Sequence, residues 1–376
     1  MALSKIDLAN MVENQMPQSL IADNINFRNI IINGDMSIAQ RSTSVSSLTS
    51  SSTYKTIDRF VTELGSNGTW TQSQSTDVPT GQGFGKSLKM DCTSTGSGGY
   101  LHITQRFEGQ NLIYLNKGRS TAESLTLSFW VKSAKTGTYI AEFRDTDNTR
   151  NISKSYTISS ANTWEKKTIT YPGDTSGGLS NDNGASLELN LWLAAGSSNT
   201  SGTLQTDWGS QVSANRAVGQ VNLGDSTSNE WYITGLQLEA GTAASDFEFL
   251  PHDVNKNRCL RYYQKSYSLG TTPGTNTTNG LHTTDGSAGG LTTGYLYGDI
   301  DLKVAMRAAP TVTIYDKAGN SGVCSRLNGG TSRTDNQNCS VIDTIEKGFN
   351  LESTGTANAG SIDIHFEAAA ELWLIQ

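Results

Sequence analysis

The sequence predicts an all-β protein built of two-layer sandwiches, and three observations support this fold class. Hydrophobic residues make up 35% and charged residues 17% of the chain, both below the usual range, and Gly, Ser, Thr and Asn fill the difference. This composition favours short strands joined by turns. Apolar and polar residues alternate along several segments, which is typical of strands with one solvated face. The one helical candidate lies near the N-terminus, so we expect under roughly a tenth of the residues in helix, against a usual share of about a third.

The first segment, residues 1–28, has too few apolar residues to bury itself. Four of them would form a narrow apolar stripe on one short helix: Leu3, Ile6, Leu8 and Met11. Asn14 and Pro17 interrupt this stripe. The segment is either a disordered tail or a docking peptide that orders against a partner, and we favour the docking peptide.

The long middle of the chain contains most of the predicted strands. We expect a first strand over 30–41, broken by a turn or bulge at Asn33-Gly34, then a surface loop of Ser and Thr over 42–52. The sandwich resumes at 57–60, and 80–85 is a glycine-rich loop. Further strands are expected over 87–92, 101–107, 125–132, 139–143, 164–171, 187–193 and 231–242. In the last of these the apolar phase shifts at Gly235, which predicts a β-bulge.

A second β domain is predicted after Pro251. Asp253 is a suitable N-cap for a short helical turn through Asn257. The strands expected beyond it cover 296–304, 311–315, 340–345, 362–366 and 371–376. Two polar loops, 270–294 and 316–338, separate them. A chain of 376 residues exceeds one ordinary core, so at least two domains are expected.

Four phrases resemble a known family in their order and spacing: Asn-Ile-Ile-Ile-Asn-Gly-Asp-Met-Ser-Ile-Ala-Gln-Arg (29–41), Tyr-Lys-Thr-Ile-Asp-Arg-Phe (54–60), Leu-Thr-Leu-Ser-Phe-Trp-Val-Lys (125–132) and Trp-Tyr-Ile-Thr-Gly-Leu-Gln-Leu-Glu-Ala-Gly-Thr (231–242). They are similar to the jelly-roll carbohydrate-binding modules of marine bacteriophage tail fibres and other virion appendages. Arg-Cys-Leu-Arg-Tyr-Tyr (258–263) and Met-Arg-Ala-Ala-Pro-Thr-Val-Thr (306–313) resemble the C-terminal knobs of such fibres. The resemblance implies four parts: an anchor (1–28), a jelly-roll domain (29–250), a linker (251–258) and a β-sandwich knob that binds a receptor (259–376).

The same resemblance implies a structural virion protein, namely a homotrimeric tail fibre made in the host cytoplasm. Ser-Lys-Ile-Asp (4–7) is similar to the segment that attaches such fibres to the particle, so another virion protein, a tail adaptor, nozzle or capsid protein, is expected to hold the N-terminus. The knob would recognise host surface glycans. Alternatives are a head-attached fibre or decoration protein, a polysaccharide depolymerase, and an accessory module of a bacterial glycan-degrading system. The missing long repeat of a parallel β-helix disfavours the depolymerase, and the missing secretion signal disfavours the accessory module.

The residues that commonly perform catalysis show no recognisable spacing. The four histidines are far apart, and neither a Gly-x-Ser-x-Gly elbow nor a phosphate-binding loop is present, so we expect no enzyme. The net charge of −7, without a Lys/Arg stripe, argues against nucleic-acid binding. No apolar run of eighteen residues exists, so no membrane insertion is expected.

No cofactor is expected either. Asp35 and Glu239 would be the ligands of a structural calcium, as in some related modules, but no ligand spacing supports this site. The four cysteines form no Cys-x-x-Cys pair, which disfavours zinc. Cys324 and Cys339 flank a Gly/Asn-rich loop that would allow them to lie close together, so a disulfide is an alternative, but free thiols are favoured.

Aromatic rings suit glycan binding because sugars present flat C–H faces that stack on them. Trp130 and Trp192 lie on the polar side of their strands, which makes both candidates. The alternatives are packing within the fold, in the core or between sheets, and coverage by a neighbouring subunit. The C-terminal loops add hydrogen-bonding candidates: Asn276, Asn279, His282, Asp285, Arg326, Asn328, Arg333 and Asn336. The last predicted strand is apolar on both faces, so we expect a subunit interface at Leu372, Trp373, Leu374 and Ile375.

Overall fold

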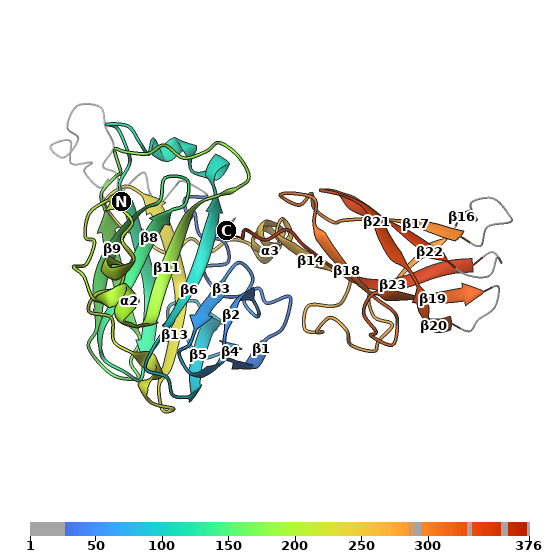
Figure 1. The fold of residues 1–376 in the computed structure, drawn as a ribbon, viewed down its shortest axis with the longest axis horizontal. Helices are drawn as coiled ribbons and strands as arrows, with labels where there is room; N and C mark the ends of the chain where they lie inside the picture. Colours follow the sequence, from blue (N-terminus) through green and yellow to red (C-terminus); the bar gives the residue numbers. More distant parts are fainter. Residues whose placement is uncertain (1–26, 286, 289–294, 329–332, 355–359, 374–376) are drawn as a thin grey trace, which may run out of the picture.

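A computed structural model describes residues 27–285, 287–288, 295–328, 333–354 and 360–373. Strands account for 45% and helices for 8% of the structure, which confirms the all-β class and the low helix content. Two β-sandwiches of unequal size lie side by side along the long axis, with helix α3 (His252–Leu260) between them (Figure 1). None of the helices in the described part of the chain is long and apolar enough to cross a membrane. The predicted anchor residues Leu3, Ile6, Leu8 and Met11 lie outside the described residues.

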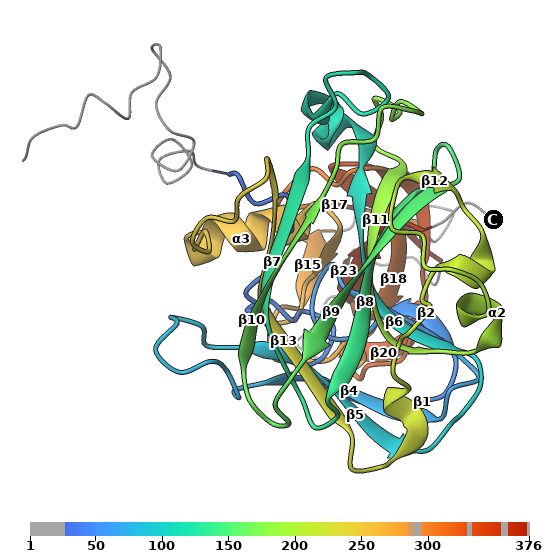
Figure 2. The ribbon, with the colours of Figure 1, turned by 90° about the vertical axis from the view of Figure 1, so that its left-hand side faces the viewer.

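The larger sandwich is a jelly roll with two antiparallel sheets. The first sheet has the strand order β1 (Ser44–Leu48), β4 (Thr69–Ser75), β5 (Ser87–Ser94), β13 (Glu230–Ala240), β7 (Leu125–Ser133), β10 (Glu165–Tyr171). The second sheet has the order β12 (Gly209–Ser210), β9 (Arg150–Ile158), β8 (Gly137–Asp145), β11 (Ala185–Ala195), β6 (Tyr100–Glu108), β3 (Val61–Gly65), β2 (Ser51–Tyr54). Figure 2 shows the two sheets as separate layers, with the short helix α2 (Ser197–Thr200) outside the second.

The core between these sheets follows the predicted period of two. The apolar side of β7 and the leucine side of β11 face each other and are buried: Leu125, Leu127, Phe129 and Val131 on β7, and Leu187, Leu189, Leu191 and Leu193 on β11. Fully burying one such side chain stabilises a fold by about 1.5–3 kcal/mol. The alternate residues of β11 therefore point out of the sandwich, away from this core.

Two local predictions in this sandwich are wrong. Residues 30–41 form no strand, because the side-chain amide of Asn33, at φ 63°, bonds the backbone of Ile38 and replaces the strand ladder. The Ser/Thr tract 42–52 is not only loop, since it contains β1 and the start of β2, which pair with β4 and β3. Residues 57–60 rejoin the sandwich as predicted, in the form of a turn before β3 with Ile57 and Phe60 buried in the core. Pairing with a neighbouring strand has overridden the weak local preference in the Ser/Thr tract.

The predicted β-bulge at Gly235 is confirmed. The register of β13 against β7 shifts between Thr234 and Gln237, and Gly235 has a positive φ of 62°. The bulge lets Leu236 donate its backbone N–H to the carbonyl oxygen of Gly34 at 2.9 Å. A Cβ on Gly34 would lie 2.0 Å from the Leu236 oxygen, so the Asn33-Gly34 turn and the bulge fit only with glycine at position 34.

The smaller sandwich also has two antiparallel sheets. One contains β14 (Tyr263–Lys265), β23 (Gly360–Ala369), β19 (Val323–Asn328) and β20 (Arg333–Asn338), with β15 (His282–Asp285) and β18 (Thr311–Tyr315) also paired to β23. The other has the order β16 (Ser287–Ala288), β17 (Tyr295–Asp301), β22 (Gly348–Thr354), β21 (Ser340–Ile345). Its core includes Leu296 and Leu351 from one sheet and Ile362, Ile364 and Phe366 from the other.

Several C-terminal predictions need correction. The predicted loop 316–338 contains the hairpin strands β19 and β20, and 270–294 contains β15 and β16, because polar residues complete these edges of the sheets. Strand β22 was not predicted. Helix α3 begins after Pro251 and extends to Leu260, so Asp253 lies in its first turn instead of capping it. Residues 371–373 form no strand. The cysteines need no correction, because Cys324 and Cys339 are free thiols, as favoured, and both are buried.

The two sandwiches meet through buried polar contacts. Glu371, which follows β23, forms an ion pair with Arg59 of the larger sandwich, and both side chains are only 1% exposed. Glu371 also pairs with Arg41 at 3.2 Å. The hydroxyl of Tyr54 donates to the Leu372 carbonyl oxygen at 3.0 Å. The end of the described chain is therefore fixed to the larger sandwich.

Candidate functional site

The outer face of the second sheet carries a groove with a cavity of about 260 Å³. Its residues come from β3, β6, β8 and β11 and from the segment that includes α2: Glu63, Tyr100, His102, Arg106, Arg144, Glu188, Trp192, Asn199 and Arg216. Because the alternate residues of these strands fill the core, the groove is built on the polar side of the same pleat.

A row of rings forms one part of the groove. The imidazole of His102 stacks on Tyr100 with ring centroids 5.7 Å apart, and it lies 4.6 Å from Trp192. Trp192 is fully buried, whereas Tyr100 is 39% exposed, so Tyr100 presents the accessible ring. Burial lowers the pKa of His102 well below its usual value, and nearby arginines lower it further, so this imidazole is neutral at pH 7.

Ion pairs between neighbouring strands fix the charged residues of the groove. Arg106 bonds Glu63 at 2.5 Å and Glu188 at 3.2 Å, and Arg144 bonds the other oxygen of Glu188 at 3.1 Å. Arg216 forms two bonds of 2.8 Å to Glu142 beneath the groove. Such paired, partly buried side chains lose little further freedom when a ligand binds.

This arrangement suits binding better than acid–base chemistry. Both groove carboxylates, Glu63 and Glu188, already accept hydrogen bonds from Arg106. The described residues contain no group of three or more His, Cys, Asp or Glu that could hold a metal ion. The two residues named as calcium ligands from the sequence both accept hydrogen bonds from protein side chains. Asp35 accepts one from the Asn255 amide at 3.0 Å, and Glu239 accepts hydrogen bonds from Gln237 and Ser245.

The two predicted tryptophans lie on opposite sides of the sandwich. Trp192 belongs to the groove, but as its buried base, because Ile140 and Ala217 pack over it and its indole N–H donates to Glu142 at 3.1 Å. Trp130 is half-buried on the outer face of the first sheet, opposite Lys166 of β10. The structure therefore does not bring them into one site.

The C-terminal candidates are spread over both exposed and buried positions. Arg326, predicted in a loop, is 2% exposed and bonds the hydroxyl and carbonyl of Ser353 on the opposite sheet, so it joins the two sheets. His282 lies on β15 with its ring 5.5 Å from Phe366. Arg333 is exposed and pairs with Asp363 at 2.5 Å. Asn276, Asn279 and Asn336 are exposed, while the side chains of Asp285 and Asn328 lie outside the described residues.

The predicted subunit interface is altered by contacts within the chain. Leu372 is 1% exposed, because it packs at the junction of the two sandwiches, and its side chain is not available to another subunit. Trp373 is 49% exposed and packs edge-on against Tyr54 at 5.3 Å. Leu374 and Ile375 lie outside the described residues.

Most groove residues were not identified from the sequence. Tyr100, His102 and Arg106 alternate with the core residues of β6, and this polar side of a central strand was the available signal. Arg144 and Arg216 come from a neighbouring strand and a distant loop. Only the pairing of β6, β8 and β11 brings these residues together.

Comparisons with known proteins give similar solved structures, all at low sequence identity among those named below. No family model matches the chain, and no curated protein matches it in sequence. A domain of bacteriophage CBA120 tailspike protein 4, described as enzymatically active, aligns with 57% of this chain and 21% of its own length, at 15% identity and a TM-score of 0.31. A putative sugar-binding protein of Bacteroides thetaiotaomicron aligns over 56% of this chain and 99% of its own, at 12% identity and a TM-score of 0.34. A xylan-binding domain from Paenibacillus barcinonensis aligns over 55% and 99%, at 14% identity and a TM-score of 0.25. Likeness at this level carries no conclusion on function.

Proposed function

We propose that this protein is a glycan-binding protein and that the groove on its second sheet holds the sugar. The observation that carries this proposal is the exposed ring of Tyr100 beside side chains fixed by ion pairs. A sugar has flat C–H faces that stack on such a ring, and hydroxyls that bond guanidinium and carboxylate groups. The groove combines both kinds of contact on one rigid sheet.

The groove binds a sugar without rearranging. Each hydroxyl transferred from water gains only about 1 kcal/mol net, so several contacts are needed. The Glu63–Arg106–Glu188–Arg144 network supplies fixed donors and acceptors, which reduces the ordering cost of binding. Linked copies on one assembly would raise the avidity by about a hundredfold or more.

The biological setting that we propose is a bacteriophage virion. The support is the resemblance of the phrases at 29–41, 54–60, 125–132 and 231–242 to modules of virion appendages. In this proposal the protein is a homotrimeric tail fibre, another virion protein holds residues 1–28, and the knob carries a second glycan contact at Asn276 and Arg333. Light scattering on the pure protein tests the trimer, and imaging of intact particles distinguishes a tail fibre from a head-attached one.

The groove is tested by glycan-array screening of the full chain, followed by calorimetry on the best oligosaccharide. We expect Arg144→Ala to weaken binding about tenfold, because Arg144 is partly exposed at the groove and holds Glu188. Arg119→Ala is the control, since Arg119 is an exposed arginine away from the groove. Equal affinity of both variants and the wild type for the oligosaccharide would show that the groove is not the glycan-binding site.

Binding without cleavage separates this proposal from a depolymerase. Both groove carboxylates bond Arg106, so we expect the oligosaccharide to be recovered intact after prolonged incubation. The appearance of new reducing ends, lost in a Glu188→Gln variant, would instead assign hydrolysis to the groove.

A further inference from the structure

A second cavity, of about 280 Å³, lies where the two sandwiches meet. Three parts of the chain form its walls: residues 27–32, the end of β6 with the following turns η2 (Gly109–Asn111) and η3 (Ile113–Leu115), and the last turn of α3. Arg106 reaches both this cavity and the groove, but the other lining residues differ. The cavity is therefore a separate place on the molecule.

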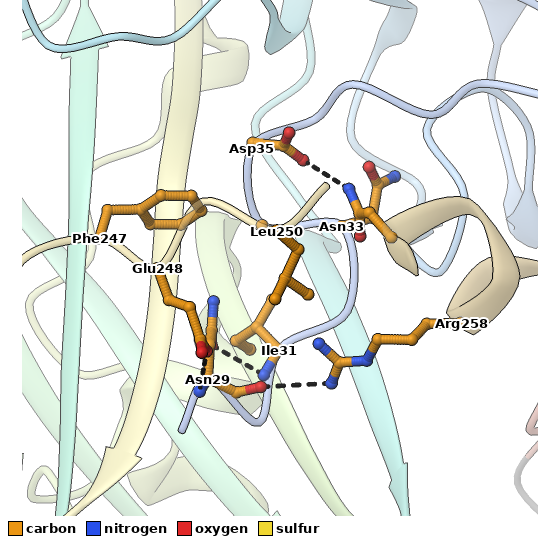
Figure 3. A pocket seen from close by; sticks show the side chains of 10 residues that line it. Asn29, Ile31, Asn33, Asp35, Phe247, Glu248, Leu250 and Arg258 are labelled. Carbon is orange, nitrogen blue, oxygen red and sulfur yellow. Dashed lines mark hydrogen bonds between the residues drawn. The ribbon is translucent and has the colours of Figure 1, made fainter. Parts of the chain in front are cut away.

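Arg258 on α3 supplies a positive charge to this cavity. Its guanidinium donates to the backbone carbonyl oxygen of Asn29 at 3.2 Å. Figure 3 shows this contact from a smaller neighbouring pocket, which Arg258 and Asn29 also line. Among the described residues, no carboxylate forms an ion pair with Arg258. Burial lowers the pKa of Arg258, and the charge of Glu248 opposes this shift only in part.

The two nearest acidic residues are engaged elsewhere. The Glu108 carboxylate accepts from Arg261 at 2.9 and 2.7 Å and from the Tyr262 hydroxyl at 2.5 Å. Burial alone would raise the pKa of Glu108, but these hydrogen bonds lower it, so the carboxylate stays charged and paired. Glu248 accepts from the backbone N–H groups of Phe27 and Asn29. Neither carboxylate forms an ion pair with Arg258, although the negative charge of Glu248 acts on it from a distance.

Apolar and aromatic side chains form one part of the remaining wall, and Arg106, Asn111 and Arg261 add polar groups to it. Ile30 and Ile32 are half-buried along one side, and the Tyr114 ring on η3 is 54% exposed. A ligand with an anionic group and a flat apolar face would match this combination, because guanidinium groups bind carboxylates through paired hydrogen bonds and rings stack on C–H faces. A volume near the lower limit of about 300 Å³ for small-ligand sites suits one sugar ring.

We propose that this junction cavity binds the carboxylate-bearing unit of an acidic saccharide, with Arg258 on the carboxylate and Tyr114 on the sugar face. The site is independent of the groove, so it stands whether or not the groove binds glycan. It gives the protein a preference for uronic-acid-type sugars over neutral ones.

The probes for this proposal are methyl glucuronide and methyl glucoside, titrated into the full chain by calorimetry or saturation-transfer NMR. We expect the glucuronide to bind at least tenfold more tightly than the glucoside. Arg258→Gln should abolish this preference, Arg258→Lys should retain part of it, and Tyr114→Ala should weaken both ligands. Arg258→Gln should fold with an unchanged or higher melting temperature, because it removes a charge that has no ionic partner.

Arg119→Ala, at an exposed arginine away from both cavities, is the control and should keep the full preference for the glucuronide. Arg144→Ala tests whether the groove contributes to the preference. Equal affinity for the two probes in the wild type would overturn the proposal. So would an undiminished preference in Arg258→Gln, or a preference lost only in Arg144→Ala, which would move acid recognition to the groove.

Discussion

Both sandwiches place arginine side chains on a sheet, but the partners of these arginines differ. In the larger sandwich, Arg106 and Arg144 lie on the outer face and share Glu188, beside a cavity that is open to solvent. In the smaller sandwich, Arg326 lies between the sheets and bonds Ser353 of the opposite sheet. The first arrangement fixes charges where a ligand has access to them, and the second holds two sheets together. A buried arginine is therefore informative about binding only when its surroundings are known.

The largest expected effect lies at the junction between the two sandwiches. Glu371→Ala leaves Arg59 buried without its ionic partner, which should reduce the free energy of unfolding by about 3–5 kcal/mol. Urea denaturation measures this change. Asp225→Ala is the control, because its pair with Lys135 is partly exposed and worth under about 1 kcal/mol. A cost for Glu371→Ala as small as that of the control would show that the junction ion pair does not stabilise the fold.

A pH effect is expected from the same region. Burial raises the pKa of Asp58 to about 6 from its ordinary 3.8, although hydrogen bonds from Gln40 oppose the shift. The folded state then binds this proton more readily than the unfolded state. Its ionised form thus destabilises the protein above pH 6, and stability should rise as pH falls from 6 towards 4, by up to about 3 kcal/mol.

The Asp58 effect is measured as the difference between wild type and Asp58→Asn in denaturation at several pH values. The variant should lose this component of the pH dependence. Parallel pH profiles for the two proteins would assign the titration to another group.

The next prediction separates structural from binding arginines. Arg326→Met should lower stability by about 1–3 kcal/mol, because buried polar groups of Ser353 lose their donor, while glycan affinity stays unchanged. Arg144→Ala should do the reverse, with stability within about 1 kcal/mol of wild type and weaker binding. Paired denaturation and calorimetry measure both quantities. Loss of glycan affinity in Arg326→Met would contradict this division.

The smallest expected effect concerns the exposed face of the knob. Arg333→Gln removes the charge that pairs with the fully buried carboxylate of Asp363 but keeps an N–H donor for it, and Arg333 itself is 35% exposed, so stability should fall by only about 1 kcal/mol. If the knob carries a second glycan contact, this variant should lower adsorption to host cells and leave oligosaccharide binding in the groove unchanged. Normal adsorption would remove Arg333 from the predicted contact surface.

The sequence predicted the parts of the fold that depend on strict alternation. The faces of β7 and β11 and the bulge at Gly235 follow from local spacing alone. The prediction of a loop at 42–52 failed because pairing with β4 and β3 decides the structure of this Ser/Thr tract. Trp192 was placed on the correct side of its strand, but its burial depends on Ala217, which comes from a distant loop. The groove arginines converge through strand pairing, which the sequence does not reveal.

The most direct test of glycan binding in the groove compares two tyrosines, one from each sandwich. Tyr100 in the groove is 39% exposed and Tyr297 on β17 is 40% exposed, so the two alanine variants remove equally accessible rings. Stacking of a sugar on a ring is worth about 1 kcal/mol or more, so Tyr100→Ala should weaken oligosaccharide binding about tenfold, and Tyr297→Ala should leave it unchanged. Equal affinity of the Tyr100→Ala variant and the wild type, or a loss confined to Tyr297→Ala, would contradict the assignment of glycan binding to the groove.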